Sequence, residues 1–143
     1  MGSITAANST YSLAINSVFP SAQILQGYAA DDAFTADAVE KAVVQMGVDG
    51  RQSAGYVFNP VIQTITLMPD SPSLIIFTEW TNAMDAIREI LPCTANISIP
   101  AIGKKYTLSN GVLVSYKPIP DVKKVLGPVP FKISWERVVG ENI

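Results

Sequence analysis

One segment between Asp70 and Pro92 has the pattern of an amphipathic helix, and the sequence on both sides of it has the pattern of β-strands. Its apolar residues recur three and four positions apart: Ile76, Phe77, Trp80, Ala83, Met84, Ile87, Ile90 and Leu91. Ser71 can cap the first turn, Pro72 suits the first helical position, and Pro92 ends the run. The sequence therefore predicts a helix over residues 71–91. A lone amphipathic helix between strands needs a sheet on which to pack.

The segment before this helix begins with a predicted strand. Residues 1–9 are small and polar, so we expect a mobile N-terminal arm. From residue 11 the apolar side chains alternate with polar ones, as in a half-buried strand. The apolar positions are Tyr11, Leu13, Ile15 and Phe19. Pro20-Ser21 should break this strand, residues 23–26 can form a second one, and residues 27–32 form a turn.

Residues 33–46 are compatible with two structures. Helix propensity favours one helix, whereas the flanking pattern favours two strands, Phe34–Ala38 and Val43–Met46, around a kink. Gly47 to Gly50 should form a turn, and residues 51–55 a polar loop. The connection is longer than an ordinary hairpin loop, and long ordered loops usually contact something. The alternative is a floppy surface loop.

The remaining chain is also rich in alternating segments. Val61–Met68 precedes the helix, with Thr64 and Thr66 on one side and Ile65 and Leu67 on the other. Further strands are expected over residues 95–99, 106–109, 112–116 and 131–138. Asn110-Gly111 predicts a tight hairpin turn, and residues 121–126 a short helical turn between prolines. The final strand directs Phe131, Ile133 and Trp135 inward.

The sum is a mainly β fold of about seven strands, a β-barrel or sandwich with one amphipathic α-helix packed on its side. A chain of 143 residues fits a single domain over residues 1–143.

The sequence offers little reactive chemistry. It has no histidine, which removes the commonest general base and metal ligand. Its single cysteine, Cys93, cannot form an internal disulfide and suits a small buried position. No phosphate-binding glycine motif and no basic stripe are present, and the net charge is −2. We therefore expect a binding or assembly protein, with no catalytic site, no cofactor and no metal.

The surface composition points to assembly. Charged residues make up 15% of the chain, against about 25% in an average soluble domain. Part of the surface is then expected to be covered by other subunits. A well-packed monomer with an uncharged polar surface is the alternative. The N-terminus lacks the pattern of a signal peptide and no apolar run reaches about 20 residues, so we expect no membrane insertion.

Several segments, in order, resemble the tail tube proteins of bacteriophages, particularly those with contractile tails. They are Leu25 to Asp32, Gly47 to Gly50, Thr64 to Leu67, and Ser71 to Ser73 followed by the helix. The likeness runs from about Tyr11 to Val138 and rests on order and spacing. One departure is the first hairpin, where such proteins have an Asn-Gly turn and this chain has Phe19-Pro20-Ser21.

The resemblance implies a structural virion protein that forms hexameric rings stacked into an inner tail tube, the conduit for DNA. It implies as partners the protein itself, the tail sheath, the baseplate or tail initiator, and the tail terminator. The tape measure protein and DNA would pass through the lumen. The protein would belong to the virion tail, after assembly in the host cytoplasm.

Two rival functions remain. One is the tube of a bacterial contractile injection or secretion system. The other is a monomeric β-sandwich that binds carbohydrate or peptide, with Tyr56, Trp80 or Trp135 as a stacking platform. Both tryptophans fall on inward stripes, which favours core packing.

Two sets of candidate functional residues follow from the resemblance and the strand pattern. The irregular segment 41–58 is the candidate assembly loop, and its interface residues are Lys41, Val43, Val44, Met46, Val48, Asp49, Arg51, Tyr56 and Phe58. The candidate lumen-facing residues are Thr64, Thr66, Asn96, Ser98, Thr107 and Ser109, which could equally face outside solvent or a sheath.

Overall fold

The computed structural model describes residues 9–25, 34–117, 119, 122 and 124–143. In chain order these residues form β1 (Thr10–Ile15), β2 (Phe19–Ile24), β3 (Phe34–Ala36), β4 (Ala42–Met46), β5 (Gln52–Tyr56), β6 (Val61–Leu67), α1 (Leu74–Ile87), β7 (Cys93–Ile99), a 3₁₀ helix (Pro100–Ile102), β8 (Lys104–Tyr116) and β9 (Val129–Asn142). The expected mainly β fold with one amphipathic helix is confirmed. The predicted turn over residues 27–32 and nearly all of the predicted mobile N-terminal segment, residues 1–9, lie outside the described residues.

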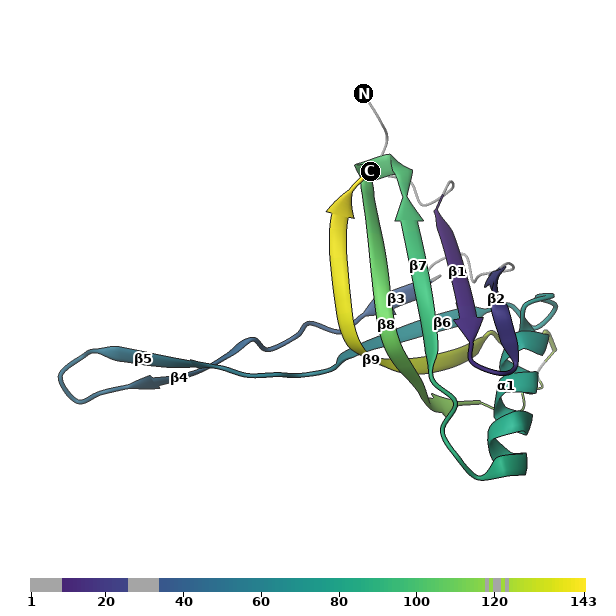
Figure 1. Ribbon diagram of the computed structural model, residues 1–143, viewed down its shortest axis with the longest axis horizontal. Coiled ribbons are helices and arrows are strands. Elements are labelled where there is room, and N and C mark those ends of the chain that lie inside the picture. The colour runs from purple at the N-terminus through teal and green to yellow at the C-terminus, as the bar shows by residue number, and fades with distance from the viewer. Residues whose placement is uncertain (1–8, 26–33, 118, 120–121, 123) are drawn as a thin grey trace.

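Seven of the strands form one antiparallel sheet in the order β2-β1-β7-β8-β9-β6-β3. Figure 1 shows β7 and β8 in front of β6 and β3, with α1 at one end. The two sides of the sheet meet through side chains. Tyr11 on β1, the strand next to edge strand β2, contacts Phe34 on edge strand β3 edge to face, with 5.3 Å between the ring centroids. The sheet is therefore curled around a core. β4 and β5 pair only with each other and project away from it (Figure 1).

The core holds a buried hydrogen-bond centre. The Gln63 Oε1 atom on β6 accepts from the Tyr11 hydroxyl at 2.7 Å and from the Trp135 Nε1–H at 3.0 Å. Tyr11 and Trp135 are fully buried, and Gln63 is 4% exposed. A buried polar group without a partner costs roughly 1–3 kcal/mol, so this centre lets two large aromatic residues lie inside the barrel.

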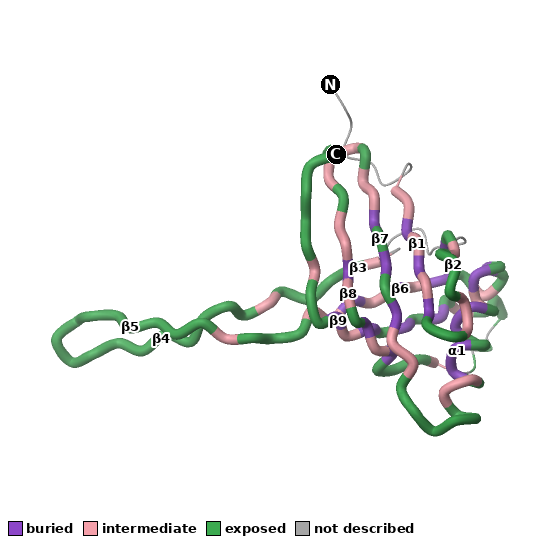
Figure 2. Tube along the Cα trace, in the orientation of Figure 1, coloured by how far each residue is buried: buried purple, intermediate pink, exposed green. Residues whose placement is uncertain are grey.

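Helix α1 packs on the sheet as its apolar stripe predicted. Ile76, Phe77, Trp80 and Thr81 are buried, and the Phe77 ring stacks on Phe131 of β9 at 4.1 Å. The Trp80 Nε1–H donates to the Leu91 carbonyl at 2.8 Å. Figure 2 shows this buried face of the helix and the buried positions along the strands as one continuous interior.

The predicted helix bounds, 71–91, were too wide. Ser71 does not cap the helix: its Oγ accepts from the Ser73 N–H at 3.1 Å in a preceding turn, and the helix begins at Leu74. At the other end Arg88 adopts φ 56°, and its N–H donates to the Met84 carbonyl at 2.7 Å. This left-handed cap stops the helix four residues before Pro92.

Two predictions for the first half of the chain need correction. Pro20 lies within β2 rather than breaking a strand, which an edge strand tolerates because an outward N–H is not needed. The turn comes earlier, at residues 16–18, where Ser17 has φ 69°. For residues 33–46 the two-strand alternative is confirmed, whereas the predicted polar loop 51–55 is mostly strand β5.

The predicted Asn110-Gly111 hairpin is wrong. Asn110 does have a positive φ, 50°, but β8 runs through it without a turn. The inward positions skip from Leu108 to Gly111 on β8, and from the buried Trp135 to the half-buried Val138 on β9, so both strands bend together at this point. The Asn110 Nδ2–H donates to Glu136 Oε2 at 3.1 Å on the exposed side of the bend. Asn110 and Gly111 thus curve the sheet instead of ending a strand.

Two further predictions concern the loop between β8 and β9 and the absence of membrane insertion. The predicted helical turn over 121–126 is absent from the residues described there, 122 and 124–126. In the described part of the chain, no helix has the length and apolar character needed to cross a membrane.

Gly111→Ala tests the tight packing at the bend. An added Cβ would lie 2.4 Å from the Trp135 ring and 2.9 Å from the Cys93 Sγ atom. We expect a loss of about 1–3 kcal/mol in the free energy of unfolding, measured with urea. Gly55→Ala is the matched control because a Cβ there meets nothing within 4 Å. Equal stability of the two variants would contradict this packing.

The buried thiol of Cys93 should make the stability of the protein depend on pH in the alkaline range. Burial raises the pKa of its thiol from 9.0 to about 12. Because the folded pKa lies above the unfolded one, this group's contribution to stability is complete below about pH 9 and is lost as pH rises toward 12. We expect Cys93→Ala to flatten the fall of stability over that range. A thiol reagent at pH 8 should label the wild-type protein only after unfolding, and rapid labelling of the folded protein would refute the burial.

Candidate assembly surfaces

The segment 41–58, hereafter the arm, is a β-hairpin that extends away from the barrel. Every residue of β4 and β5 is exposed, and Figure 2 shows the arm as a continuous exposed ribbon. A two-stranded hairpin is marginally stable in water on its own. The arm is held by hydrogen bonds between its own strands.

The tip of the arm is a defined turn. The Gly47 N–H donates to the Arg51 carbonyl at 2.7 Å, and the Gly50 N–H donates to the Gly47 carbonyl at 3.0 Å. The Asp49 carboxylate accepts from the Arg51 N–H at 3.0 Å, and Gly50 has φ 84°, which favours glycine. This turn presents Val48 fully to solvent.

The root of the arm is fastened across its two strands. The Val57 N–H donates to the Lys41 carbonyl at 3.0 Å, and the Asn59 side-chain amide donates to the Glu40 carbonyl at 2.9 Å. The Lys41 ammonium lies 5.9 Å from the centre of the Tyr56 ring. These contacts hold the two strands together where they leave the barrel.

One face of the arm is apolar. Residues directly opposite one another in an antiparallel pair share a face, and the register places Ala42 opposite Tyr56, and Val44 opposite Ala54. Met46 continues this face, and Phe58 meets the Tyr56 ring edge to face at 4.9 Å. We call this set the arm stripe: Ala42, Val44, Met46, Ala54, Tyr56 and Phe58. Gln52, opposite Met46, is the polar residue on this face, and the other face carries Val43, Gln45, Ser53 and Gly55.

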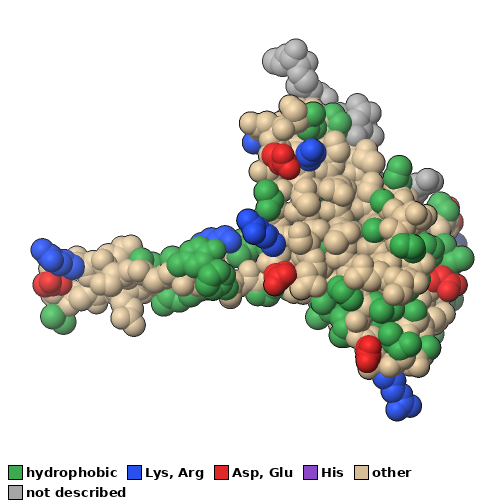
Figure 3. All heavy atoms as spheres, viewed as in Figure 1, with side chains coloured by type: hydrophobic (Ala, Val, Ile, Leu, Met, Phe, Trp, Pro, Cys, Tyr) green, Lys and Arg blue, Asp and Glu red, His purple; other side chains and the backbone are tan. Residues whose placement is uncertain are grey.

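The arm stripe leaves large apolar groups in water. Phe58 is 89% exposed, Tyr56 66% and Met46 65%. Figure 3 shows hydrophobic side chains gathered along the arm, with Lys and Arg near its root and tip. Exposed apolar area of this kind marks a protein–protein contact surface.

The six candidate lumen residues fall on two separate parts of the sheet. Asn96 pairs with Thr107, Ser98 with Lys105 and Ser109 with Arg137, so four of them share the outer face of β7 and β8. Thr64 and Thr66 lie on the outer face of β6, opposite Lys132 and Pro130. The bend in β8 and β9 separates the two groups. This outer face continues onto the paired part of β9 and is polar apart from Val139. Its charges are of both signs, with Lys105 on β8 and Arg137 and Glu141 on β9.

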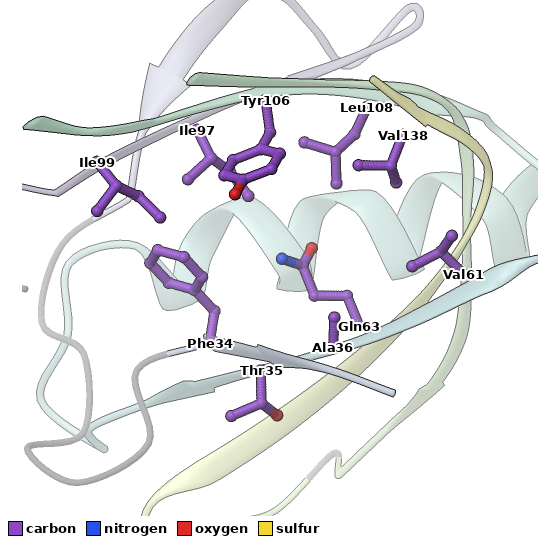
Figure 4. A pocket seen from close by; sticks show the side chains of 10 residues that line it. All are labelled: Phe34, Thr35, Ala36, Val61, Gln63, Ile97, Ile99, Tyr106, Leu108 and Val138. Carbon is purple, nitrogen blue, oxygen red and sulfur yellow. The ribbon is translucent and has the colours of Figure 1, made fainter. Parts of the chain in front are cut away.

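A cavity of about 310 Å³ opens inside the barrel between β3 and β6 on one side and β7 and β8 on the other. Figure 4 shows the Gln63 amide and the Tyr106 ring pointing into it from opposite walls, among apolar side chains. None of the described residues that line it is charged. In the described residues no three His, Cys, Asp or Glu side chains lie close enough to hold a metal ion.

The tryptophans of the monomeric binding alternative are not available to a ligand. Trp80 and Trp135 are fully buried, and each indole N–H is hydrogen-bonded within the protein. Tyr56 is exposed, but it belongs to the arm stripe. The structure therefore removes the stacking platform from the barrel.

Comparison with known families gives a match over nearly the whole chain. Residues 2–139 match the model of the family described as tail fiber protein gp32. The chain belongs to this family. A comparison with curated sequences found no match.

Solved structures show the same fold at low sequence identity. A chain from the sheath–tube complex of the extracellular contractile injection system PVC, in the extended state, matches with a TM-score of 0.63 at 10% identity, covering 93% of this chain and 88% of that one. A chain from the PVC sheath/tube terminator matches with a TM-score of 0.62 at 10% identity, covering 92% of each chain. A chain from the anti-feeding prophage baseplate gives 0.59 at 11% identity, covering 94% and 92%. This gp32-family protein therefore has the fold of contractile-tail tube proteins.

The sequence located the arm but not its structure. The alternation of Ala42, Val44 and Met46 was readable, whereas Ser53, Ala54 and Gly55 carry almost no strand signal, so β5 was missed. Ala54 joins the arm stripe only through the register of the hairpin.

Variants of the arm stripe test whether it serves the subunit's own fold. Val44→Ser and Met46→Ser should each change the free energy of unfolding of the unassembled protein by less than about 0.5 kcal/mol, because both side chains lie in water. Ile133→Ser in the core is the comparison and should cost several times more. A loss above about 1 kcal/mol from the stripe variants would mean that the arm packs on its own barrel.

Proposed function

We propose that this gp32-family protein is the tube protein of a contractile phage tail. Six copies close into a ring, rings stack into the inner tube, and DNA passes through the channel. The observation that carries the proposal is the arm: an ordered hairpin with an apolar face and no packing partner of its own, on a barrel with the fold of contractile-tail tubes. In this function the arm joins neighbouring subunits.

Ring formation is supported by the edges of the sheet and by one relative. Among the described strands, β2 and β3 each have one unpaired edge, which can add strands from a neighbour. A ring of identical copies needs such a heterologous contact between two different surfaces. One solved structure with this fold comes from a baseplate with six-fold symmetry.

We assign the channel wall to the outer face of β7 and β8. This face gathers Asn96, Ser98, Thr107 and Ser109. Together with the paired residues Arg137 and Glu141 of β9 its charges are of both signs, so it has no single-sign field to hold DNA. Thr64 and Thr66 then lie away from this wall. We expect the tape measure protein and DNA as the contents of the channel.

The remaining partners follow from the same function. The tail sheath would surround the tube, the baseplate or tail initiator would start it, and the terminator would end it. Structures with this fold come from sheath–tube, terminator and baseplate complexes. The protein would be assembled in the host cytoplasm and act in the virion tail.

An injection-system tube is the second candidate. It is favoured by the matches with PVC and the anti-feeding prophage, which are tube-bearing systems with this fold. The family description, a tail protein, favours the phage. The contents of purified particles separate the two, because only the phage tail joins a head filled with DNA.

Met46→Asp tests the arm as an assembly element. A charge in the arm stripe should abolish tubes in negative-stain electron microscopy while leaving a folded subunit, since burying an unpaired carboxylate is costly. Gln45→Asp is the matched control, with the same charge change on the other face of the arm, and should still form tubes.

Deletion of residues 47–50 makes the same test without adding a charge. The deletion should give a folded protein that no longer polymerises. Normal tubes from both the deletion and Met46→Asp would rule out the assembly role of the arm.

A further inference from the structure

The cavity inside the barrel contains a hydrogen-bond donor that has no acceptor. The Gln63 amide oxygen already accepts from the Tyr11 hydroxyl and from the Trp135 indole N–H. Within the described part of the chain, the Gln63 Nε2 group donates to no carbonyl and to no side chain. Gln63 is 4% exposed, so most of the surrounding water cannot reach this group either. A buried donor without an acceptor costs free energy and calls for a bound acceptor.

The chemistry of Trp135 fixes which end of the amide faces the cavity. An indole N–H can only donate, so the Gln63 atom that lies 3.0 Å from it must be the oxygen. Figure 4 shows the amide pointing into the cavity, toward the wall that carries Tyr106. The Tyr106 hydroxyl likewise has no hydrogen-bond partner among the described residues. Two donors therefore face the same space from opposite walls.

Most of the cavity wall is apolar. Ile97 and Ile99 of β7 and Leu108 of β8 lie on one side, and Phe34 of β3 and Val61 of β6 lie on the other. No charged side chain is found among the described residues of this wall. A charged ligand would lose its hydration here without gaining an ion pair. The wall therefore selects an uncharged molecule whose surface is mostly hydrocarbon.

The size and position of the cavity suit a small ligand. Its volume of about 310 Å³ is about twice the roughly 150 Å³ of an apolar cavity that holds benzene. A molecule of two fused rings therefore fits. Ala36 of edge strand β3 lines the cavity and is exposed, so the cavity meets solvent beside this strand. A ligand can enter there while the barrel stays folded.

Water alone would satisfy this cavity poorly. A buried water needs about two to four polar partners. Gln63, Tyr106 and Thr35 are the described lining residues with polar side-chain atoms, and Figure 4 shows the Thr35 side chain directed away from the other two. An apolar molecule with one acceptor oxygen satisfies the amide donor and also removes the hydrocarbon wall from water.

We propose that this cavity binds one small uncharged molecule, with an apolar body of about two fused rings in size and a carbonyl oxygen. The carbonyl oxygen accepts from the Gln63 Nε2–H, and the Tyr106 hydroxyl is a second donor on the opposite wall. This ligand site goes beyond the proposed tube function and does not depend on it, because the site lies within a single barrel.

Equilibrium dialysis of the full chain tests the site with two probes. The ketone 2-acetylnaphthalene has two fused rings and one carbonyl oxygen, and 2-isopropylnaphthalene has nearly the same shape without an acceptor. A cavity with no donor would rank the two as hexadecane does, because hydrocarbon leaves the carbonyl unpaired. We expect one ketone per chain. The ratio of ketone to hydrocarbon affinity should exceed the ratio of their water-to-hexadecane partition coefficients by about tenfold or more.

Neighbouring valines on β9 supply matched variants. Val138 lines the cavity, so Val138→Phe should fill it and weaken ketone binding by about tenfold or more. Val139→Phe places the same ring on the outer face, where Val139 pairs with Thr107, and should leave ketone binding unchanged. Tyr106→Phe removes the second donor and should still favour the ketone above the partition ratio, because the Gln63 N–H group remains.

Several results would overturn the site. One is the absence of ketone binding to the wild-type protein at the solubility limit of the probe, and another is an affinity ratio equal to the partition ratio. Equal ketone binding by Val138→Phe and Val139→Phe would place the ligand elsewhere, and loss of the preference in Tyr106→Phe would exclude Gln63 as its donor. Dialysis measures binding by single subunits, rings and tubes alike, so a failure of the proposed tube function leaves this test intact.

Discussion

The packing of Trp135 is the contact on which both halves of the sheet depend. Its indole lies on β9, against the bare backbone of Gly111 on β8, and its N–H donates to Gln63 on β6. Gln63 also accepts from Tyr11 on β1. The side chains of Trp135 and Gln63 together therefore connect four strands, β9, β8, β6 and β1. If residue 111 carried a Cβ, or if residue 63 lacked its amide, the sheet could not close over an indole at this depth.

This closed barrel explains why the arm is free to serve another purpose. The core is complete within the sheet and α1, so residues 41–58 contribute no buried side chain to it. The hydrogen bonds at the tip and root fix the shape of the arm in advance. A contact surface that is already ordered loses less conformational entropy when it binds. The barrel is thus a rigid support, and the arm is a preformed binding element attached to it.

The sequence predicted those parts of the fold in which local pattern and tertiary packing agree. The alternation in β1, β6 and β9 and the stripe of α1 all point to one core, and the structure places them there. Asn110-Gly111 was misread because a positive φ serves a bend as well as a turn, and only the depth of Trp135 decides between them. β5 was missed because Ser53, Ala54 and Gly55 at its centre are small and have little strand propensity. The shared face of the arm stripe depends on register, which no local pattern specifies.

The exposed apolar residues give a physical reason for the low charge of the chain. The arm stripe gathers several of them on one face of the hairpin, and others lie on the barrel, among them Ile75 on α1 and Val114 and Tyr116 on β8. A dimer with two-fold symmetry would pair like with like and leave one of these surfaces in water. In the proposed tube, a head-to-tail contact repeated in every ring would cover both. The same separation keeps the polar outer face of β7 and β8 out of that contact, and so leaves it free to line a channel.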